Sequence, residues 1–366
     1  MDVPVERSAA TKERLMSLDA LRGFDMFWII GGGEVLAALA KVHPNRFTLT
    51  LQSQLQHVQW DGVHFEDLIY PLFLFIIGVV LPFSLARRRA QGQGLGSLYL
   101  HSLRRSLLLV VLSSIPAGLL RFEHWPFMGA VLAHIGLCYF FAVPFVLHLR
   151  WRWRVVLVVG FLYLYWLAST FIPVPGHGAG VFTERGSLAS WIDEQLISGR
   201  LWNEGPASTP SGVCIILWGS LAGEWLRSSR SGRRKAAGLA LLGLAAVIVG
   251  TLWSLSFPMI KRVVWSSSYV TFACGVSLLL LALFYWAIDV QGYRKWAFFF
   301  VVIGTNAITI YFLQSIVPFG EIAKIFVQGI RDHSGLLAPL VFPLGALALK
   351  WLLLWFLYRH RIFFRL

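Results

Sequence analysis

One short segment of the chain, residues 57–67, concentrates side chains that can exchange protons. It holds two histidines and three carboxylates just before an apolar run, namely His57, Asp61, His64, Glu66 and Asp67. A carboxylate orients a neighbouring imidazole and stabilises its cation, so a His–carboxylate pair is suited to general-base catalysis. A loop at the membrane surface whose charges face water is the alternative. Spacing alone leaves both interpretations open.

Metal binding is a weaker interpretation of the same segment. It contains no cysteine and no HExxH arrangement, which are the strongest sequence signs of a zinc site. We therefore expect no metal. No Walker A loop, GxSxG elbow or GxGxxG after an expected strand occurs in the sequence, so soluble nucleotide-binding and hydrolase folds are unsupported.

Two further polar groups interrupt apolar stretches. The segment 261–269 opens one stretch with three serines, which would cap a helix N-terminus or form a polar wall of the same cavity. Asn306 and Gln314 are eight residues apart and so lie roughly on one face of a helix. Hydrogen bonding between helices explains them about as well as ligand contact does.

The elements that position these groups follow from composition. Of the 366 residues, 57% are hydrophobic and only 14% are charged, whereas a soluble domain usually has about a quarter charged residues. Such a chain cannot cover its apolar surface with polar side chains. It is predicted to be an all-α, polytopic integral membrane helix bundle. The excess of 32 Lys and Arg over 18 Asp and Glu fits membrane topology better than nucleic-acid binding.

About 20 apolar residues are needed to cross a bilayer. Ten segments meet this expectation approximately: 20–41, 64–86, 101–120, 128–149, 153–172, 211–227, 236–257, 266–288, 296–318 and 336–358. Residues 1–14 are expected to form a cytoplasmic tail without a signal peptide, and residues 15–366 a single transmembrane domain. The first segment is the least apolar, because Asp19, Arg22 and Asp25 are spaced three apart along it. They would pair along one helix face or help to hold an anionic ligand entering from the cytosol.

Basic residues predict the orientation of this bundle. With the N-terminus inside, 22 Lys and Arg fall on the cytoplasmic side and nine on the other. This bias favours an even number of spans with both ends in the cytoplasm. Two outward segments, 42–63 and 173–210, are longer than topology requires and rich in aromatic residues. Long ordered loops are usually functional, so the outer face is expected to hold a site.

An ordered set of motifs runs from about residue 14 to the end of the chain. They are Arg14-Leu-Met-Ser-Leu-Asp19-Ala-Leu-Arg22-Gly23, His57-x2-Trp60-Asp61-Gly62-x4-Asp67-Leu68-x2-Pro71, Phe171-Ile-Pro173-Val-Pro175-Gly176, Glu204-Gly205, Trp265-Ser266-x-Ser268-Tyr269, Gly304-x-Asn306 and Tyr358-Arg359-x2-Ile362-Phe363. In this order they resemble the heparan-α-glucosaminide N-acetyltransferase family, within the wider group of transmembrane acyltransferases. The chain resembles a bacterial-type member.

The resemblance implies an activity and a catalytic residue. Family members move an acetyl group from cytosolic acetyl-CoA onto the amine of a terminal glucosamine on the far side of the membrane. Their catalytic histidine corresponds to His57, which would act as general base or acetyl carrier with Asp67 and Asp61 as acidic partners. A basic residue of the family's fourth span corresponds to His134. The family's first-span asparagine and ninth-span histidine are replaced here by Ile29 and Gln314.

Topology then divides the remaining site residues between the two substrates. The phosphates of acetyl-CoA cannot cross the hydrocarbon core unaided and would meet arginines at the cytoplasmic mouth. The expected acetyl-CoA-binding residues are Arg22, Arg104, Arg105, His134, Ser268, Tyr269 and Asn306. The expected residues for the amino-sugar or glycan acceptor are Trp60, Glu204, Trp265 and Arg262.

Two other functions stay open. A transporter of sugars or lipid-linked intermediates would use the same cavity without chemistry, although no inverted repeat is evident. An O-acyltransferase would instead modify a hydroxyl of a cell-envelope glycan. Related proteins suggest a homodimer in the lipid membrane, and the compact chain suggests a bacterial inner membrane protein with no nucleic-acid partner.

Overall fold

The computed structural model describes residues 15–116, 118, 131–196 and 204–363. Within these residues the chain is helical and forms no strand. The expected tail, 1–14, lies outside the described part. The α-helices are α1 Met16–Phe27, α2 Gly33–Val42, α3 Arg46–Gln54, α4 Phe65–Ala90, α5 Leu95–Ser114, α6 Val131–His148, α7 Trp151–Phe171, α8 Leu188–Leu196, α9 Thr209–Arg227, α10 Gly232–Trp253, α11 Ser267–Phe284, α12 Ala297–Thr305, α13 Ala307–Leu313, α14 Phe319–His333 and α15 Ala338–Arg359.

Eight helices of the described chain are long and apolar enough to cross a membrane, and the chain is an integral membrane protein. They correspond to eight of the ten expected segments. The other two expected segments fall on α9 and on the pair α12–α13, whose helix is interrupted at Asn306. The total of ten crossings and the cytoplasmic location of the ends therefore stay predictions.

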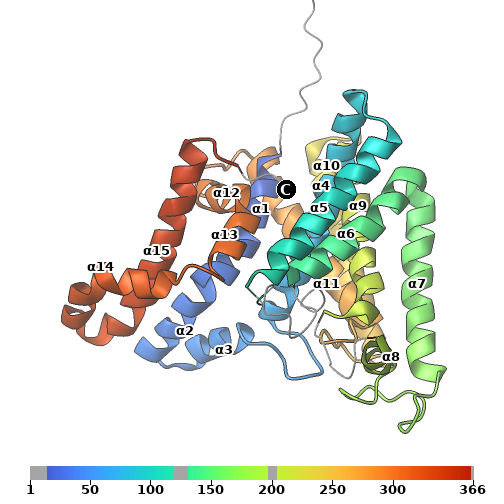
Figure 1. Cartoon of the computed structure of the whole chain (residues 1–366), viewed down its shortest axis with the longest axis horizontal. Coiled ribbons are helices and arrows are strands. Elements are labelled where there is room, and N and C mark those ends of the chain that lie inside the picture. The colour runs from blue at the N-terminus through green and yellow to red at the C-terminus, as the bar shows by residue number, and fades with distance from the viewer. Residues whose placement is uncertain (1–14, 117, 119–130, 197–203, 364–366) are drawn as a thin grey trace, which may run out of the picture.

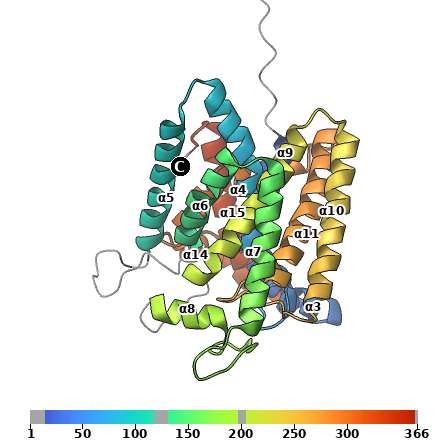
Figure 2. The same cartoon turned by 90° about the vertical axis from the view of Figure 1, so that its right-hand side faces the viewer.

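The long helices stand side by side, as Figures 1 and 2 show from two directions. The start of α1 and the end of α15 lie at the same end of the bundle (Figure 1). The shorter helices α3 and α8 lie near the opposite end in both views, and Figure 1 shows α14 at the lower end of α15. This opposite end carries the loop between α3 and α4, where the proton-exchanging segment is located.

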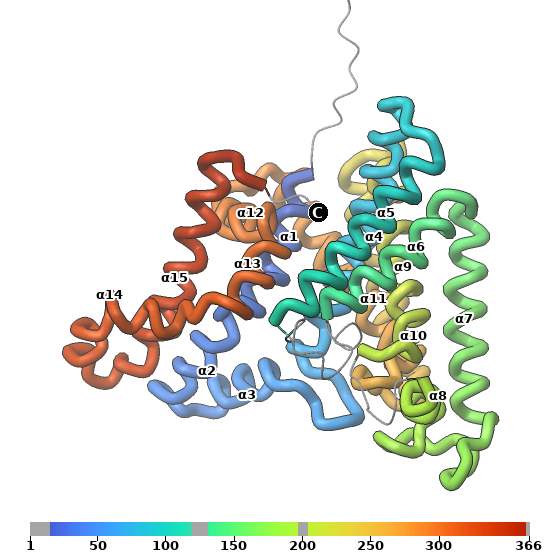
Figure 3. Tube along the Cα trace, viewed as in Figure 1, coloured from blue at the N-terminus to red at the C-terminus, as the bar shows by residue number. Residues whose placement is uncertain are grey.

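The first membrane-length segment is not one regular helix. Residues Trp28–Gly32 form a π-helical segment between α1 and α2, and Gly31 has φ 148°. A residue with a Cβ rarely adopts this conformation, so the glycine-rich stretch permits the bend that Figure 3 traces between α1 and α2. The charged residues Asp19, Arg22 and Asp25 lie in α1, before this break.

Glycines bring the central helices into direct backbone contact. A Cβ on Gly78 of α4 would lie 2.1 Å from the carbonyl oxygen of Ile216 on α9. A Cβ on Gly304 of α12 would lie 1.9 Å from the carbonyl oxygen of Asp19 on α1. Small residues commonly permit such close approach in membrane proteins. These contacts set the positions of α1 and α4, which carry much of the candidate site.

Candidate active site

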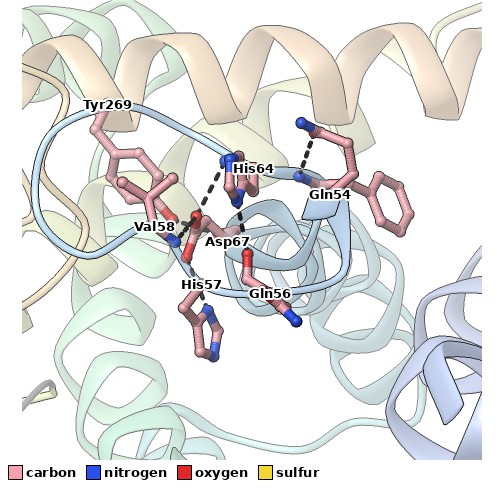
Figure 4. Close-up of polar contacts among 8 residues, drawn as sticks. Gln54, Gln56, His57, Val58, His64, Asp67 and Tyr269 are labelled. Atoms are coloured by element: carbon pink, nitrogen blue, oxygen red, sulfur yellow. Dashed lines mark hydrogen bonds and ion pairs between the residues drawn. The ribbon is translucent and has the colours of Figure 1, made fainter. Parts of the chain in front are cut away.

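His57 and Asp67 form the central pair of the candidate site. Nδ1 of His57 lies 2.8 Å from Oδ1 of Asp67. The Asp67 side chain is 3% exposed, whereas that of His57 is 53% exposed. The carboxylate is therefore fixed inside the protein while the imidazole reaches out from it, as Figure 4 shows.

Asp67 is held because it also caps its own helix. It lies in the first turn of α4, and its Oδ2 accepts hydrogen bonds from the backbone N–H groups of His64 at 3.0 Å and Val58 at 3.3 Å. Such caps satisfy N–H groups that a helix start leaves unpaired. The hydroxyl of Tyr269 donates to the Asp67 carbonyl oxygen at 2.6 Å. The carboxylate position is thus determined from three directions.

The loop that carries His57 is tied to the same helix start. Nδ1 of His64 donates to the Gln56 carbonyl oxygen at 2.8 Å, and the backbone N–H of Phe65 donates to Oε1 of Gln54 at 3.2 Å. Figure 4 shows these contacts around the helix start. His64 therefore supports the loop, and His57 is the histidine of this segment that pairs with a carboxylate.

The hydrogen bond to Asp67 determines the tautomer of His57. A carboxylate accepts, so Nδ1 carries the proton and the neutral ring keeps a lone pair on Nε2. Nε2 can then accept a proton or act as a nucleophile. The negative charge of Asp67 stabilises the imidazolium that would form, which is the arrangement of a base held by an orienting carboxylate.

His57 borders a cavity of about 300 Å³. Its polar lining residues are His57, Glu66, Tyr70, Glu204, Lys261 and Tyr311. Ile29, which replaces the asparagine that the resemblance implies, also lines this cavity. Basic and acidic groups therefore face one cavity, with apolar side chains completing the wall. We refer to this space as the reaction cavity.

Glu204 is a buried carboxylate at the edge of the reaction cavity, with 8% of the residue exposed. Burial raises the pKa of its carboxyl, and the charges of Lys261 and His57 oppose part of this rise. A carboxylate oxygen at the edge of the cavity can accept a hydrogen bond from an amine N–H group. The structure thus brings Glu204 to His57, although the two are far apart in sequence.

His134 is buried behind the reaction cavity. Its Nδ1 lies 2.6 Å from the Tyr70 hydroxyl, and Trp265 packs edge-on against both rings. His134 and Trp265 are absent from the lining of the reaction cavity among the described residues. They position Tyr70, which does line it.

The serine-rich segment before α11 is mainly structural. Ser266 caps α11 by accepting from the Tyr269 N–H, and the hydroxyl of Ser268 donates to the Phe257 carbonyl oxygen at 2.6 Å. Both serines and Tyr269 are fully buried. Ser268 and Tyr269 are absent from the described lining of the reaction cavity, and Tyr269 acts through its hydrogen bond to Asp67.

A second cavity, of about 400 Å³, lies toward the other end of the bundle. It is rich in basic groups, and we call it the basic cavity. Its cationic and titratable lining residues are Arg22, Arg87, Arg88, His101 and Arg105. Arg22 donates to the Gly304 carbonyl oxygen at 3.4 Å and lies 3.5 Å from Asp19. Such a cluster of arginines is suited to binding phosphate groups.

Of the neighbouring arginines expected here, one lines the basic cavity and one does not. Arg105 lines it and stacks 4.6 Å from the Tyr139 ring centre. Arg104 is exposed on the other side of α5 and is not among the lining residues. Asn306 lines the cavity at the break between α12 and α13, and its side-chain amide donates to the Ile362 carbonyl oxygen at 3.1 Å.

The two cavities border one another. Phe73 and Ile308 line both of them. Helix α4 contributes Arg87 and Arg88 to the basic cavity and Glu66 to the reaction cavity. The two cavities therefore run through the bundle from the cluster of arginines to the His57–Asp67 pair.

The residues expected outside the membrane surround His57 less closely. Trp60 donates from Nε1 to the Phe182 carbonyl oxygen at 2.6 Å, and Arg262 pairs with Glu184 at 3.7 Å. Trp60 and Arg262 line a shallow hollow of about 30 Å³ next to His57 and Lys261. Asp61 is exposed and absent from the described lining of this hollow and of both cavities.

Several lining residues were not among the sequence-predicted site residues. The sequence indicated no site role for Arg87, Arg88, His101 and Tyr70. Glu66 and Lys261 belong to the two polar segments singled out in the sequence, and both line the reaction cavity. The three consecutive arginines 87–89, directly after the expected segment 64–86, are the sequence signal that could have indicated Arg87 and Arg88. Nothing in the local sequence distinguishes Tyr70 from other aromatic residues within spans.

Comparisons with known proteins give one consistent result. No family model matches the chain. The chain is similar to heparan-alpha-glucosaminide N-acetyltransferase of Homo sapiens, with 26% identity over 98% of the chain and 61% of the human protein. The protein of the same name from Mus musculus is 24% identical, over 100% of the chain and 62% of its own length. The chain thus spans about three fifths of these relatives. Along nearly its whole length, this integral membrane chain is therefore similar to named N-acetyltransferases, which supports the family that its motifs predict.

Proposed function

We propose that the protein is a transmembrane acetyltransferase. It would move the acetyl group of acetyl-CoA to the amine of a terminal glucosamine or a related amino sugar. The names of the similar proteins support the reaction class. The observation that carries the proposal is that the His57–Asp67 pair borders a reaction cavity adjoining a basic cavity through shared walls.

The basic cavity is the proposed site of the coenzyme's phosphates. Arg22, Arg88 and Arg105 supply guanidinium groups, which bind phosphate oxygens in bidentate geometry. Asn306 adds an amide at the same cavity. The pantetheine arm would pass Phe73 and present its thioester to His57. In this orientation the basic end of the bundle faces the cytoplasm, where acetyl-CoA is found.

The acceptor amine would bind in the reaction cavity, beside His57. Glu204 and Lys261 lie beside His57, and Trp60 and Arg262 line the hollow next to it. A carboxylate that holds the acceptor amine near His57 would orient its nitrogen toward the thioester carbonyl. Positioning of this kind converts a bimolecular reaction into an effectively unimolecular one.

The proposed chemistry uses the lone pair on Nε2 of His57. The acceptor amine attacks the thioester carbonyl, Nε2 takes the amine proton, and Asp67 stabilises the resulting imidazolium. Collapse of the tetrahedral intermediate forms the amide and breaks the C–S bond. The imidazolium proton then neutralises the departing thiolate, which leaves as CoA thiol. In the alternative route Nε2 itself attacks the thioester and passes the acetyl group to the amine.

Acetyl transfer by the purified protein tests this proposal. With acetyl-CoA and glucosamine, we expect N-acetylglucosamine and free CoA thiol in equal amounts, and we expect His57→Ala to abolish both. His43→Ala, which changes an exposed histidine outside the site, is the matched control. A folded His57→Ala variant with near-normal transfer would disprove the mechanism. Rapid quench with acetyl-CoA alone distinguishes the two routes, because only the second yields an acetylated enzyme.

Three finer statements accompany this proposal. We propose that both chain ends are cytoplasmic, since the start of α1 and the end of α15 lie at the same, basic end of the bundle. Location in a bacterial inner membrane and a homodimeric state stay predictions from the sequence. Protease protection of tagged ends in oriented vesicles checks the first, and mass photometry in nanodiscs checks the oligomeric state.

A further inference from the structure

An apolar groove of about 610 Å³ lies between α6, α7 and α9. One face of α6 supplies Leu137, Phe141 and Phe145, spaced four residues apart, and α7 supplies Leu157 and Phe161. Helix α9 completes the groove with Thr209, Pro210, Val213 and Cys214. Figure 2 shows these three helices side by side. We call this the lateral groove.

The lateral groove lies on the hydrocarbon-facing side of the bundle. Helices α6 and α7 are both long and apolar enough to cross a membrane. Phe141 lines the groove and is 49% exposed, and Val156 on the adjacent face of α7 is 58% exposed. Exposed apolar side chains at this depth contact lipid. The medium at the mouth of the groove is therefore hydrocarbon rather than water.

The inner end of the groove meets the reaction cavity. Glu204 lines both spaces. His134 lines the groove and is hydrogen-bonded to Tyr70, which lines the reaction cavity. Polar groups thus gather at one end of an otherwise apolar groove, at the wall that separates it from His57. This polarity pattern matches a molecule with a hydrocarbon tail and a polar head.

We propose that the lateral groove binds the hydrocarbon chain of a lipid-linked amino sugar whose amine is the acetyl acceptor. The inference rests on the proposed function and specifies its acceptor class. The chain would lie between α6 and α7, with the sugar amine at Glu204 and within reach of His57. The acceptor would therefore enter laterally from the bilayer.

The lining of the groove favours a hydrocarbon chain over an extended protein segment. His134 and Phe145 are eleven residues apart on α6, which corresponds to about 16 Å. An extended backbone in this lining would leave its N–H and C=O groups without partners, which is costly in lipid. An alkyl or isoprenoid chain has no such groups.

The test compares two acceptors that share a head group. In nanodiscs, acetyl transfer is measured with methyl glucosaminide and with dodecyl glucosaminide. Each methylene transferred from water improves affinity about fourfold, and partition of the chain into the bilayer offsets part of this gain. We therefore expect a KM for the dodecyl acceptor that is lower by at least about tenfold in total concentration. Leu157→Trp fills the groove, and Val156→Trp places the same side chain on the adjacent lipid-facing position. Only Leu157→Trp should remove the advantage of the dodecyl chain.

A second measurement is independent of catalysis. Dodecyl glucosaminide with a diazirine near the chain end is photolysed with wild-type protein, and labelled peptides are mapped. We expect saturable labelling of α6 and α7 within the groove, reduced by Leu157→Trp and unchanged by Val156→Trp. Labelling without acetyl transfer would support the groove and refute the proposed function. Absence of groove labelling, or equal competition by dodecyl maltoside, which lacks the amine, would overturn the inference even if glucosamine is acetylated.

Discussion

Replacement of Asp67 by asparagine separates the charge of this side chain from its shape. In the native protein Oδ1 accepts from Nδ1 of His57 at 2.8 Å, while Oδ2 accepts from two backbone N–H groups. Asparagine has one oxygen, and the backbone N–H groups of His64 at the start of α4 and of Val58 in the preceding loop will retain it. Its amide NH₂ then faces His57, so Nδ1 must accept and the ring proton moves to Nε2.

With the proton on Nε2, His57 can neither take the amine proton nor attack the thioester. General-base catalysis contributes on the order of 10²–10⁴-fold, and the equivalent change in a serine protease triad lowers kcat about 10⁴-fold. We therefore expect Asp67→Asn to lower kcat about 10³-fold, which corresponds to about 4 kcal/mol of transition-state stabilisation. The KM for acetyl-CoA should be unchanged, because Asp67 is absent from the described lining of the basic cavity.

The assay is release of CoA thiol by purified protein in nanodiscs, at saturating glucosamine and varied acetyl-CoA. Asp332→Asn serves as the matched control, because this carboxylate is exposed on α14 and contacts Gln328. Thermal unfolding verifies that the variant is folded. If folded Asp67→Asn retains activity within about tenfold of the native protein, the tautomer argument is refuted.

Three other perturbations test the cavities and the packing. Arg105→Gln should raise the KM for acetyl-CoA about tenfold, which corresponds to about 1.4 kcal/mol of binding free energy. The KM for S-acetyl-N-acetylcysteamine, a thioester without phosphates, should not change; steady-state kinetics measures both constants. Gly304→Ala should lower the free energy of unfolding by about 1–3 kcal/mol, because the added Cβ would lie 1.9 Å from a backbone oxygen of α1. Unfolding in detergent measures this change. Burial raises the pKa of Asp193 from 3.8 to about 6, so the folded state binds a proton more tightly than the unfolded state. Stability should therefore fall as pH rises from about 4 to about 6 by at most about 3 kcal/mol, and Asp193→Asn should abolish this slope in thermal unfolding.

Each of these predictions has an outcome that contradicts it. Equal effects of Arg105→Gln on both thioesters would show that Arg105 does not contact the phosphates. Gly160→Ala is the control for Gly304→Ala, because no atom lies within 4 Å of its added Cβ; equal destabilisation by both would remove the packing argument. If the stability of Asp193→Asn depends on pH as that of the native protein does, another group causes this dependence.

The membrane fold was largely predictable, because lipid imposes long apolar helices on any chain of this composition. The expected segments 64–86 and 153–172 correspond to α4 and α7. The break at Gly31 and the interruption at Asn306 were not predictable. Hydropathy averages over a whole span, whereas a break depends on single backbone conformations and on the helices packed around them.

For the candidate site, the sequence alone determined the local unit. His57, His64 and Asp67 lie in one segment, and helix capping places Asp67 in the first turn of α4, from which it reaches both the backbone and His57. The basic residues that mark one end of the bundle were also visible in the sequence. These features depend on short-range spacing, so they did not need the rest of the fold.

Only the tertiary structure decided what surrounds this unit. It placed Glu204 and Lys261 at His57, included Arg88 in the basic cavity and left Arg104 and Asp61 outside both cavities. It also showed that Trp265, Ser268 and Tyr269 act as internal supports. The physical reason is that the orientation of a residue on a helix depends on how that helix rotates against its neighbours. In this protein, backbone contacts at glycines such as Gly78 and Gly304 determine that rotation.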